Sequence, residues 1–514
     1  MSKFSALASK AAAAAAQSVA KKRLLVIGSG NMAAPIISAF RKANPNYEIV
    51  VCSPSAMEKN DYYSRIGVKT HSDPFSISGK FDDIVVAIKP QNFLEKVLGP
   101  YKEFLKQGNE KTRVTSIAAG KSIAEIKKFF PDSIPIRTMP NTPIGTPNPD
   151  RVNEGVTGIF AEHGVAAEHV NFIITSFGGT CIPVADESAI NAITAVSGSG
   201  PAYNFYIAEV IFDAAQRIAY EFVKSAEDET LLQEKAIFGL MQEACKSIPE
   251  GQSLKEFRSQ NKTDIDKKVE EIMSKKGSMK SFFLEIMQLN LENGDKDKAI
   301  KSAMLYSAEK FIDGAMELGF GERDANLLVT RTMEGSAALA LSSKNNAPTL
   351  RQKVTSPAGT TFYGLQVLME NEVDPYAGKS VIEKRDMTLA EICSGTLRAA
   401  YNRAVALSGD QKKTIEVGVK AGATQEQIDA VAKIIADAAK RGALVRAIQS
   451  GDVDQIAKAV AEIAVAANVA AVQKDGVVQK DGASKQEDPS PVSITSSAFS
   501  SSLLQQGERG KVQR

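Results

Sequence analysis

Short apolar runs alternate with helical stretches from Lys22 to about Val184. Several of these runs are apolar without interruption, which is typical of strands in a parallel sheet that is covered on both faces. The pattern predicts strands at Arg23–Gly28, Glu48–Cys52, Asp83–Ile88, Arg113–Ile117 and Gly155–Phe160. Because strands that alternate with helices build α/β folds, we expect a doubly wound sheet over residues 22–186.

The pattern changes after Ser188, where β-rich runs end and apolar positions recur at helical spacing. Such spacing is found in Tyr203–Ala219, Ala303–Leu318 and Glu322–Leu341. It predicts a second, all-helical domain over residues 187–385. The segment at about 219–297 is rich in Lys and Glu and is interrupted by Pro and Gly, so we interpret it as an inserted, charged helical segment with solvated faces.

Both ends of the chain differ from these domains in composition. Residues 1–21 form an Ala-rich leader, and no Asp or Glu occurs before Glu48, a composition shared by organellar transit peptides and by Ala-rich bacterial leader helices. Residues 386–472 predict a helical extension, which either binds a partner or packs on its own core. Residues 473–514 are Ser-rich with few large apolar groups, which predicts a disordered tail.

Charge and cysteine content exclude several classes of function. The 514 residues carry 62 Lys and Arg against 60 Asp and Glu, and this near-neutral balance argues against binding to nucleic acid or to an acidic membrane. The four cysteines are far apart, without the spacing of a metal site or a disulfide framework. No apolar run approaches the roughly 20 residues that span a bilayer. We therefore expect a soluble, cytoplasmic protein without a metal, the organelle being the alternative that the leader leaves open.

A glycine loop follows the first predicted strand. The sequence from Gly28 to Ala33 fits the G-x-G-x-x-A pattern of Rossmann-like domains, and a predicted helix follows it. Gly28 permits the tight turn, Gly30 lets the backbone approach a pyrophosphate, and the phosphates lie on free amides at the helix start. The loop predicts that Gly28, Ser29, Gly30, Asn31 and Met32 bind a dinucleotide.

The next predicted strand bears on the choice of cofactor. An NAD site usually ends this strand with a carboxylate that binds the ribose hydroxyls, but here the strand ends in Cys52 and Ser53, with Lys59 shortly after. The absence of a carboxylate favours NADPH, and NADH is the alternative. Because ligands of open α/β sheets bind at the carboxyl ends of strands, two later loops are also expected to contact the cofactor. Their residues are Ala87, Ile88, Lys89 and Pro90 in the first loop, and Ala118 and Ala119 in the second.

Two further motifs open predicted helices. They are SGSGPAY at Ser197–Tyr203 and TSPAGTT at Thr355–Thr361. With the glycine loop and the two later loops, they make the chain resemble the pyrroline-5-carboxylate reductase family over about Lys22–Ala215 and Ser307–Glu370. The chain departs from that family in its charged insert, in its long C-terminal extension and in Ala358, a conservative change where the family often has glycine.

The resemblance implies roles for the residues of these motifs. Thr361 would be catalytic through a hydrogen bond to the ring nitrogen of the substrate. Ser356, Gly359 and Thr360 would surround the substrate carboxylate, and Ser197 and Gly198 would form pocket walls. Without the resemblance, Ser and Thr at a helix start are ordinary helix caps. The family also implies a homodimer interlocked through the helical domains, or a larger ring of dimers, with a pocket built from two chains.

The implied reaction is the NADPH-dependent reduction of 1-pyrroline-5-carboxylate to L-proline, the last step of proline biosynthesis. A protonated imine is already electrophilic and needs little acid–base help, which suits a chain whose three histidines all lie outside the motifs. One alternative is another NADPH-dependent imine or hydroxyacid oxidoreductase of the same architecture. A hydroxyacid dehydrogenase generally needs a catalytic lysine in its helical domain, for which Lys344 and Lys353 are the candidates. A non-catalytic nucleotide-sensing scaffold is another alternative.

Overall fold

The computed structural model describes residues 21–148, 152–223, 229–292, 297–369 and 387–408. The predicted Ala-rich leader, apart from Lys21, lies outside the described residues. The predicted tail at 473–514 lies outside them as well, and so does the predicted extension beyond residue 408.

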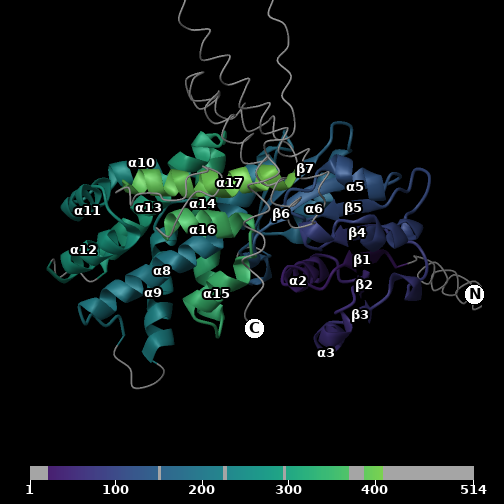
Figure 1. The fold of residues 1–514 in the computed structure, drawn as a ribbon, viewed down its shortest axis with the longest axis horizontal. Coiled ribbons are helices and arrows are strands. Elements are labelled where there is room, and N and C mark those ends of the chain that lie inside the picture. Colours follow the sequence, from purple (N-terminus) through teal and green to yellow (C-terminus); the bar gives the residue numbers. More distant parts are fainter. Residues whose placement is uncertain (1–20, 149–151, 224–228, 293–296, 370–386, 409–514) are drawn as a thin grey trace, which may run out of the picture. The chain divides into compact units, whose positions relative to one another are not determined.

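The N-terminal part is an eight-stranded sheet with the strand order β3-β2-β1-β4-β5-β6-β7-β8 (Figure 1). All neighbouring strands are parallel except β6 and β7, which are antiparallel. The strands are β1 (Arg23–Ile27), β2 (Glu48–Cys52), β3 (Val68–His71), β4 (Asp83–Val86), β5 (Arg113–Ser116), β6 (Ile134–Pro140), β7 (Val156–Ala161) and β8 (Thr180–Pro183). The doubly wound sheet is therefore confirmed, although β3, β6 and β8 are not among the predicted strands.

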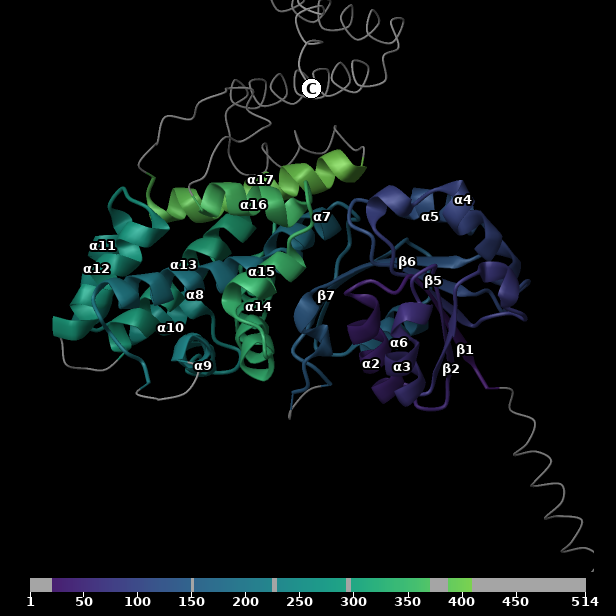
Figure 2. The ribbon, with the colours of Figure 1, turned by 60° about the horizontal axis from the view of Figure 1, so that its bottom comes forward.

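Helices cover both faces of this sheet (Figure 2). One face packs on α2 (Ala33–Ala43), α3 (Asn60–Arg65) and α6 (Ala167–Phe177), and the other on α4 (Glu95–Leu98) and α5 (Ile123–Phe129). Successive strand residues point to opposite faces, so Leu24 and Val26 belong to the first layer of buried side chains and Leu25 and Ile27 to the second. Burial on both faces explains why β1 is apolar from Leu24 to Ile27.

After β8 the described residues form helices joined by turns, with one isolated β-bridge between Gly277 and Met387. The helices are α7 (Ala189–Ile193), α8 (Gly200–Arg217), α9 (Glu229–Lys246), α10 (Leu254–Gln260), α11 (Asp264–Ser274), α12 (Met279–Glu292), α13 (Lys298–Glu317), α14 (Glu322–Ser342), α15 (Ala347–Val354), α16 (Thr360–Leu368) and α17 (Leu389–Ser408). A π-helical turn at Thr194–Gly198 joins α7 to the start of α8. None of the described helices is long and apolar enough to cross a membrane.

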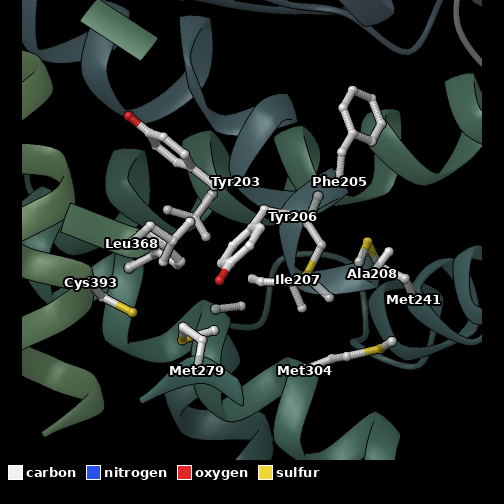
Figure 3. Close-up of a cluster of buried hydrophobic side chains, with 14 of the residues drawn as sticks. Tyr203, Phe205, Tyr206, Ile207, Ala208, Met241, Met279, Met304, Leu368 and Cys393 are labelled. Atoms are coloured by element: carbon white, nitrogen blue, oxygen red, sulfur yellow. The ribbon is translucent and has the colours of Figure 1, made fainter. Parts of the chain in front are cut away.

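One hydrophobic core holds these helices together, and the predicted insert contributes to it. Figure 3 shows Tyr206 of α8 among Met279 of α12, Met304 of α13, Leu368 of α16 and Cys393 of α17. Within the insert, the apolar face of α12 is buried although its surroundings in sequence are charged. The expectation of solvated faces therefore holds only for the outward sides of these helices.

The last described helix, α17, belongs to the same core. It packs against α13 and α16, and α16 and α17 lie side by side in Figures 1 and 2. A Cβ at Gly314 of α13 would lie 3.1 Å from the Cα of Ser394, so glycine allows the backbones of α13 and α17 to approach closely. The helical core thus continues past residue 386, where the sequence predicts a separate extension.

Candidate active site

The dinucleotide loop lies at the point where the strand order of the sheet reverses. Strand β1 pairs with β2 on one side and with β4 on the other. The amide of Gly28 donates to the carbonyl of Cys52 at 2.9 Å, and the amide of Ala87 donates to the carbonyl of Ile27 at 2.8 Å. Ligands of open α/β sheets bind at such a switch point, beyond the carboxyl ends of the strands. The structure thus brings the loops after β1, β2, β4 and β5 to one edge.

The two glycines of the loop are required for different reasons. Gly28 has φ 111°, and a Cβ there would lie 2.4 Å from the carbonyl oxygen of Ala87, so the protein itself demands glycine. A Cβ at Gly30 would meet nothing within 4 Å. Protein packing therefore does not explain Gly30, whereas close approach of a pyrophosphate does.

The start of α2 has the properties of an anion site. Its N-cap, Met32, provides no capping side chain, and its first turn contains no acidic residue. Gly30 and Asn31 are exposed, while Ala33 is buried against the sheet as the motif requires. The free amides and the positive end of the helix dipole can therefore receive a phosphate.

Three serines and a lysine gather between the ends of β1 and β2. The hydroxyl of Ser29 lies 2.7 Å from that of Ser53 and 3.0 Å from that of Ser55. The ammonium of Lys59 donates to the carbonyl of Ser29 at 2.6 Å. This group contains hydroxyls and a cation but no carboxylate, so it suits a ribose phosphate better than a free 2′-hydroxyl.

The remaining predicted cofactor residues lie in the loops after β4 and β5. Lys89 is exposed, and Pro90 begins a 3₁₀ turn that ends at Asn92. Ala87 and Ile88, in the loop after β4, are partly buried and contact Gly28. Ala118 is buried and Ala119 is partly buried. A Cβ at the neighbouring Gly120 would lie 2.6 Å from the Cβ of Leu407, so the end of α17 abuts the loop after β5.

A tight turn precedes α16 at the second candidate site. The amide of Gly359 donates to the carbonyl of Ser356 at 3.0 Å, which leaves Pro357 and Ala358 as the central residues of the turn. Ala358 has φ 53°, a left-handed conformation that glycine adopts without cost and alanine does not. The alanine at this position is therefore not a conservative change, because the turn demands a positive φ.

Helix α16 begins without a side-chain cap. Its N-cap is Gly359, and no acidic residue lies in its first turn. The first amide bonded within the helix is that of Tyr363, which donates to the carbonyl of Gly359, so the amides of Thr360, Thr361 and Phe362 precede it. Neither threonine acts as the N-cap, which removes the ordinary capping explanation for their presence.

The hydroxyls of both threonines meet Ser199, a residue that the sequence analysis did not single out. Thr361 donates to the Ser199 hydroxyl at 3.1 Å, and the Thr360 hydroxyl lies 3.2 Å from it. Tyr203 lies beside this group, because a Cβ at Gly364 of α16 would lie 2.2 Å from the phenol oxygen. Burial raises the pKa of Tyr203 far above its ordinary value, so the phenol is neutral at physiological pH.

Ser197 and Gly198, the predicted pocket walls, make other contacts than Ser199 and the two threonines. Ser197 is fully buried, and its hydroxyl accepts from Asn141 at 3.2 Å and from Thr332 at 3.1 Å. Gly198 is partly exposed and faces Met139. Ser197 therefore joins β6, the start of α8 and α14, while Ser199 is the serine of the motif that contacts α16.

Family models and curated proteins of known name match several parts of the chain. Residues 187–246 and 300–406 match the model "Pyrroline-5-carboxylate reductase dimerisation", and residues 23–120 match "NADP oxidoreductase coenzyme F420-dependent". A pyrroline-5-carboxylate reductase of Haemophilus influenzae is 33% identical over 195 residues, which are 37% of this chain and 68% of that protein. The chain belongs to the pyrroline-5-carboxylate reductase family.

Other members of the family are similar over comparable lengths. The enzyme of Vibrio alginolyticus is 30% identical over 225 residues, 42% of this chain and 76% of that protein. The structure of a pyrroline-5-carboxylate reductase from Coxiella burnetii matches at 24% identity over 76% of this chain and 99% of that chain. Its TM-score is 0.38, which is too low to bear on function.

The residues that the family model leaves unmatched show where this chain differs from its relatives. The dimerisation model omits residues 247–299, which contain α10, α11 and α12, but it includes α9 and nearly all of α17. The sequence pattern predicts the insert at about 219–297 and the extension from residue 386. By the family match, α9 and α17 are helices that relatives share.

Proposed function

We propose that this chain reduces 1-pyrroline-5-carboxylate to L-proline with NADPH, the last step of proline biosynthesis. The observation that carries the proposal is the start of α16, where the Thr361 hydroxyl and three amides of an uncapped helix lie together. In a member of the pyrroline-5-carboxylate reductase family, this arrangement supplies what a cyclic imine with a carboxylate requires.

The residues at the edge of the sheet fit a phosphorylated dinucleotide. Gly28, Ser29, Gly30, Asn31 and Met32 would hold the pyrophosphate at the start of α2, where the open space beside Gly30 leaves room for a close approach of the phosphates. Ser53, Ser55 and Lys59 would hold the ribose phosphate. The loops with Ala87–Pro90 and Ala118–Ala119 would flank the nicotinamide half. When bound, NADPH supplies the hydride; NADH is the weaker alternative.

The start of α16 would orient the substrate. The amides of Thr360, Thr361 and Phe362, with the hydroxyl of Ser356, would bind the carboxylate at the positive end of the helix dipole, and Gly359, whose amide closes the turn on Ser356, would lie beside it. The Thr361 hydroxyl would hydrogen-bond the ring nitrogen and set the position of the C=N bond. The imine nitrogen is protonated before its carbon accepts the hydride, so no side chain has to deliver a proton to carbon.

We further propose a cytoplasmic homodimer, or a ring of such dimers, with the pocket completed by the second chain. The match of α7–α9 and α13–α17 to a dimerisation model supports association through the helical part. Light scattering at micromolar concentration tests this assembly. A monomer that is fully active would contradict it.

The proposed reaction is tested by NADPH oxidation with pyrroline-5-carboxylate, compared with a panel of hydroxyacids and other imines. Lys344 and Lys353, which a hydroxyacid dehydrogenase would need inside its pocket, are both exposed. Preferential oxidation with a hydroxyacid would overturn the proposal. A melting temperature raised by NADPH without turnover of any substrate would instead identify a nucleotide-sensing scaffold.

A further inference from the structure

The turn before α16 holds an alanine in a backbone conformation that favours glycine. Its third residue is Ala358 with φ 53°, a position at which turns ordinarily have glycine or asparagine. A left-handed conformation is unfavourable for an L-residue because its Cβ comes too close to the following carbonyl oxygen. The amides that follow the turn, those of Thr360, Thr361 and Phe362, are the ones that we assign to the substrate carboxylate. Some other part of the molecule must therefore hold this turn in its shape.

Arg403 of α17 contacts the turn at Ala358. Its Nε donates to the carbonyl of Ala358 at 2.8 Å. Its guanidinium carbon lies 5.3 Å from the centre of the Tyr363 ring, one turn into α16, so the side chain is held by a second contact. The carbonyl of Ala358 and the amide of Gly359 belong to one planar peptide group, so fixing the first also holds the second in its hydrogen bond to the Ser356 carbonyl, which closes the turn that leads into α16.

The helix that carries Arg403 also contacts the cofactor side of the molecule. Leu407 lies one helical turn further along α17 and abuts Gly120 in the loop after β5. Arg403 and Leu407 share a face of α17, and through them the helix contacts both the turn before α16 and the loop that we assign to the nicotinamide half of the cofactor.

We propose that Arg403 is a positioning residue for substrate binding, which holds Ala358 in its left-handed conformation so that the amides at the start of α16 converge on the carboxylate. This inference rests on the proposed function. It deepens that function by naming a residue, 45 positions away from the turn, on which recognition of the carboxylate depends. Glycine at position 358 would make the arginine largely dispensable.

The test is a double-mutant cycle on the full-length protein, with R403M, A358G and the double variant. R403M should raise the KM for pyrroline-5-carboxylate about tenfold, the size of effect expected for one charge-assisted hydrogen bond. The KM for NADPH should stay within about twofold of the wild-type value, and kcat should change less than the KM for the imine. In the A358G background the same substitution should raise that KM by only about twofold, since glycine adopts the turn unaided.

A matched control is R398M on the same helix. Arg398 is 63% exposed in its side chain and pairs with Glu317 rather than with the turn, so its loss should leave both KM values unchanged. R403K, which keeps the charge but places its donor differently, serves if R403M does not fold. A carboxylate-specific readout is inhibition by L-proline compared with pyrrolidine: R403M should weaken only the former.

The outcomes separate this inference from the proposed function. If the wild-type protein does not reduce pyrroline-5-carboxylate, the proposed function is wrong and the inference falls with it. If the wild type is active and R403M has an equal effect in the wild-type and A358G backgrounds, only the inference is overturned. Equal losses in kcat and in affinity for both substrates, with a lowered Tm, would likewise overturn it, because they would indicate a merely structural arginine.

Discussion

The starts of α2 and α16 both leave backbone amides free to bind an anion, but the loops before them obtain their shape in different ways. Each helix begins without a capping side chain or an acidic residue in its first turn, and each follows a residue with positive φ. Before α2 that residue is Gly28, which adopts a positive φ without cost and leaves no room for a side chain beside Ala87. Before α16 it is Ala358, whose carbonyl is bound by Arg403 of a later helix. The shape of the first loop is thus contained in its local sequence, whereas the shape of the second depends on a distant side chain.

The largest effect should come from Gly28→Val. Its side chain would collide with the carbonyl of Ala87 at a φ of 111°, which costs on the order of 3 kcal/mol of stability and displaces the loop. We expect a markedly lower melting temperature and no measurable NADPH binding. Gly30→Val is the matched control, because it meets nothing within 4 Å: it should keep the melting temperature and lose only NADPH affinity. Equal melting curves for the two variants would refute the distinction between the glycines.

Thr361→Ala should have the next largest effect. It removes the hydroxyl that we propose for the hydrogen bond to the substrate ring nitrogen, so turnover should fall about tenfold to a hundredfold while NADPH affinity stays unchanged. Thr361→Ser, which keeps the hydroxyl, should retain most of the activity. Steady-state kinetics and a cofactor titration measure both. A Thr361→Ala variant with full turnover and a lowered melting point would show that the residue serves only the helix.

Ser53→Asp should shift the cofactor preference. A carboxylate at the end of β2 repels a ribose phosphate and accepts from ribose hydroxyls, so the ratio of kcat/KM for NADPH over NADH should fall by about tenfold or more. The hydroxyls of Ser29 and Ser55 remain in this variant. An unchanged ratio would place the ribose phosphate away from these serines.

Ser199→Ala should have the smallest effect. The substitution removes the acceptor of the Thr361 hydroxyl, and a neutral hydrogen bond of this kind contributes about 1 kcal/mol, or roughly fivefold in rate. Because Ser197 bonds instead to Asn141 and Thr332, Ser197→Ala should lower the melting temperature with little change in turnover. The reverse pattern in the two variants would exchange the roles that we give to these serines.

The strands that the sequence predicted and those that it missed differ in physical character. Strands β1, β2 and β4 are buried on both faces and are apolar after their first residue, so they stand out. Strand β3 is a short edge strand of mixed exposure, and β6 contains prolines at 135 and 140 that argue against a strand inside a sheet. Strand β8 is a short edge strand with an exposed proline at its end. Sheet context, which no local pattern encodes, makes these segments strands.

The candidate site divides in the same way. Residues contiguous with a motif, such as Gly28–Met32 and Ser356–Thr361, could be named from the sequence. The choice between Ser197 and Ser199 could not, because the π-helical turn at Thr194–Gly198 rotates the residues that follow it by an amount that a regular helix would not predict. Arg403 carried no signal at all, since its contact with Ala358 arises only from the packing of α17 beside α16.

The place of α17 in the helical core has a consequence for synthesis of the chain on the ribosome. The sheet can close as soon as β8 has emerged, because its eight strands are all encoded before residue 184. The helical core cannot close until Cys393 and Leu397 are made, and these side chains are buried against helices translated up to about 190 residues earlier. The surfaces of α13 and α16 that α17 covers therefore stay exposed until α17 has been made, and we expect the nascent chain to depend most on chaperones in that interval.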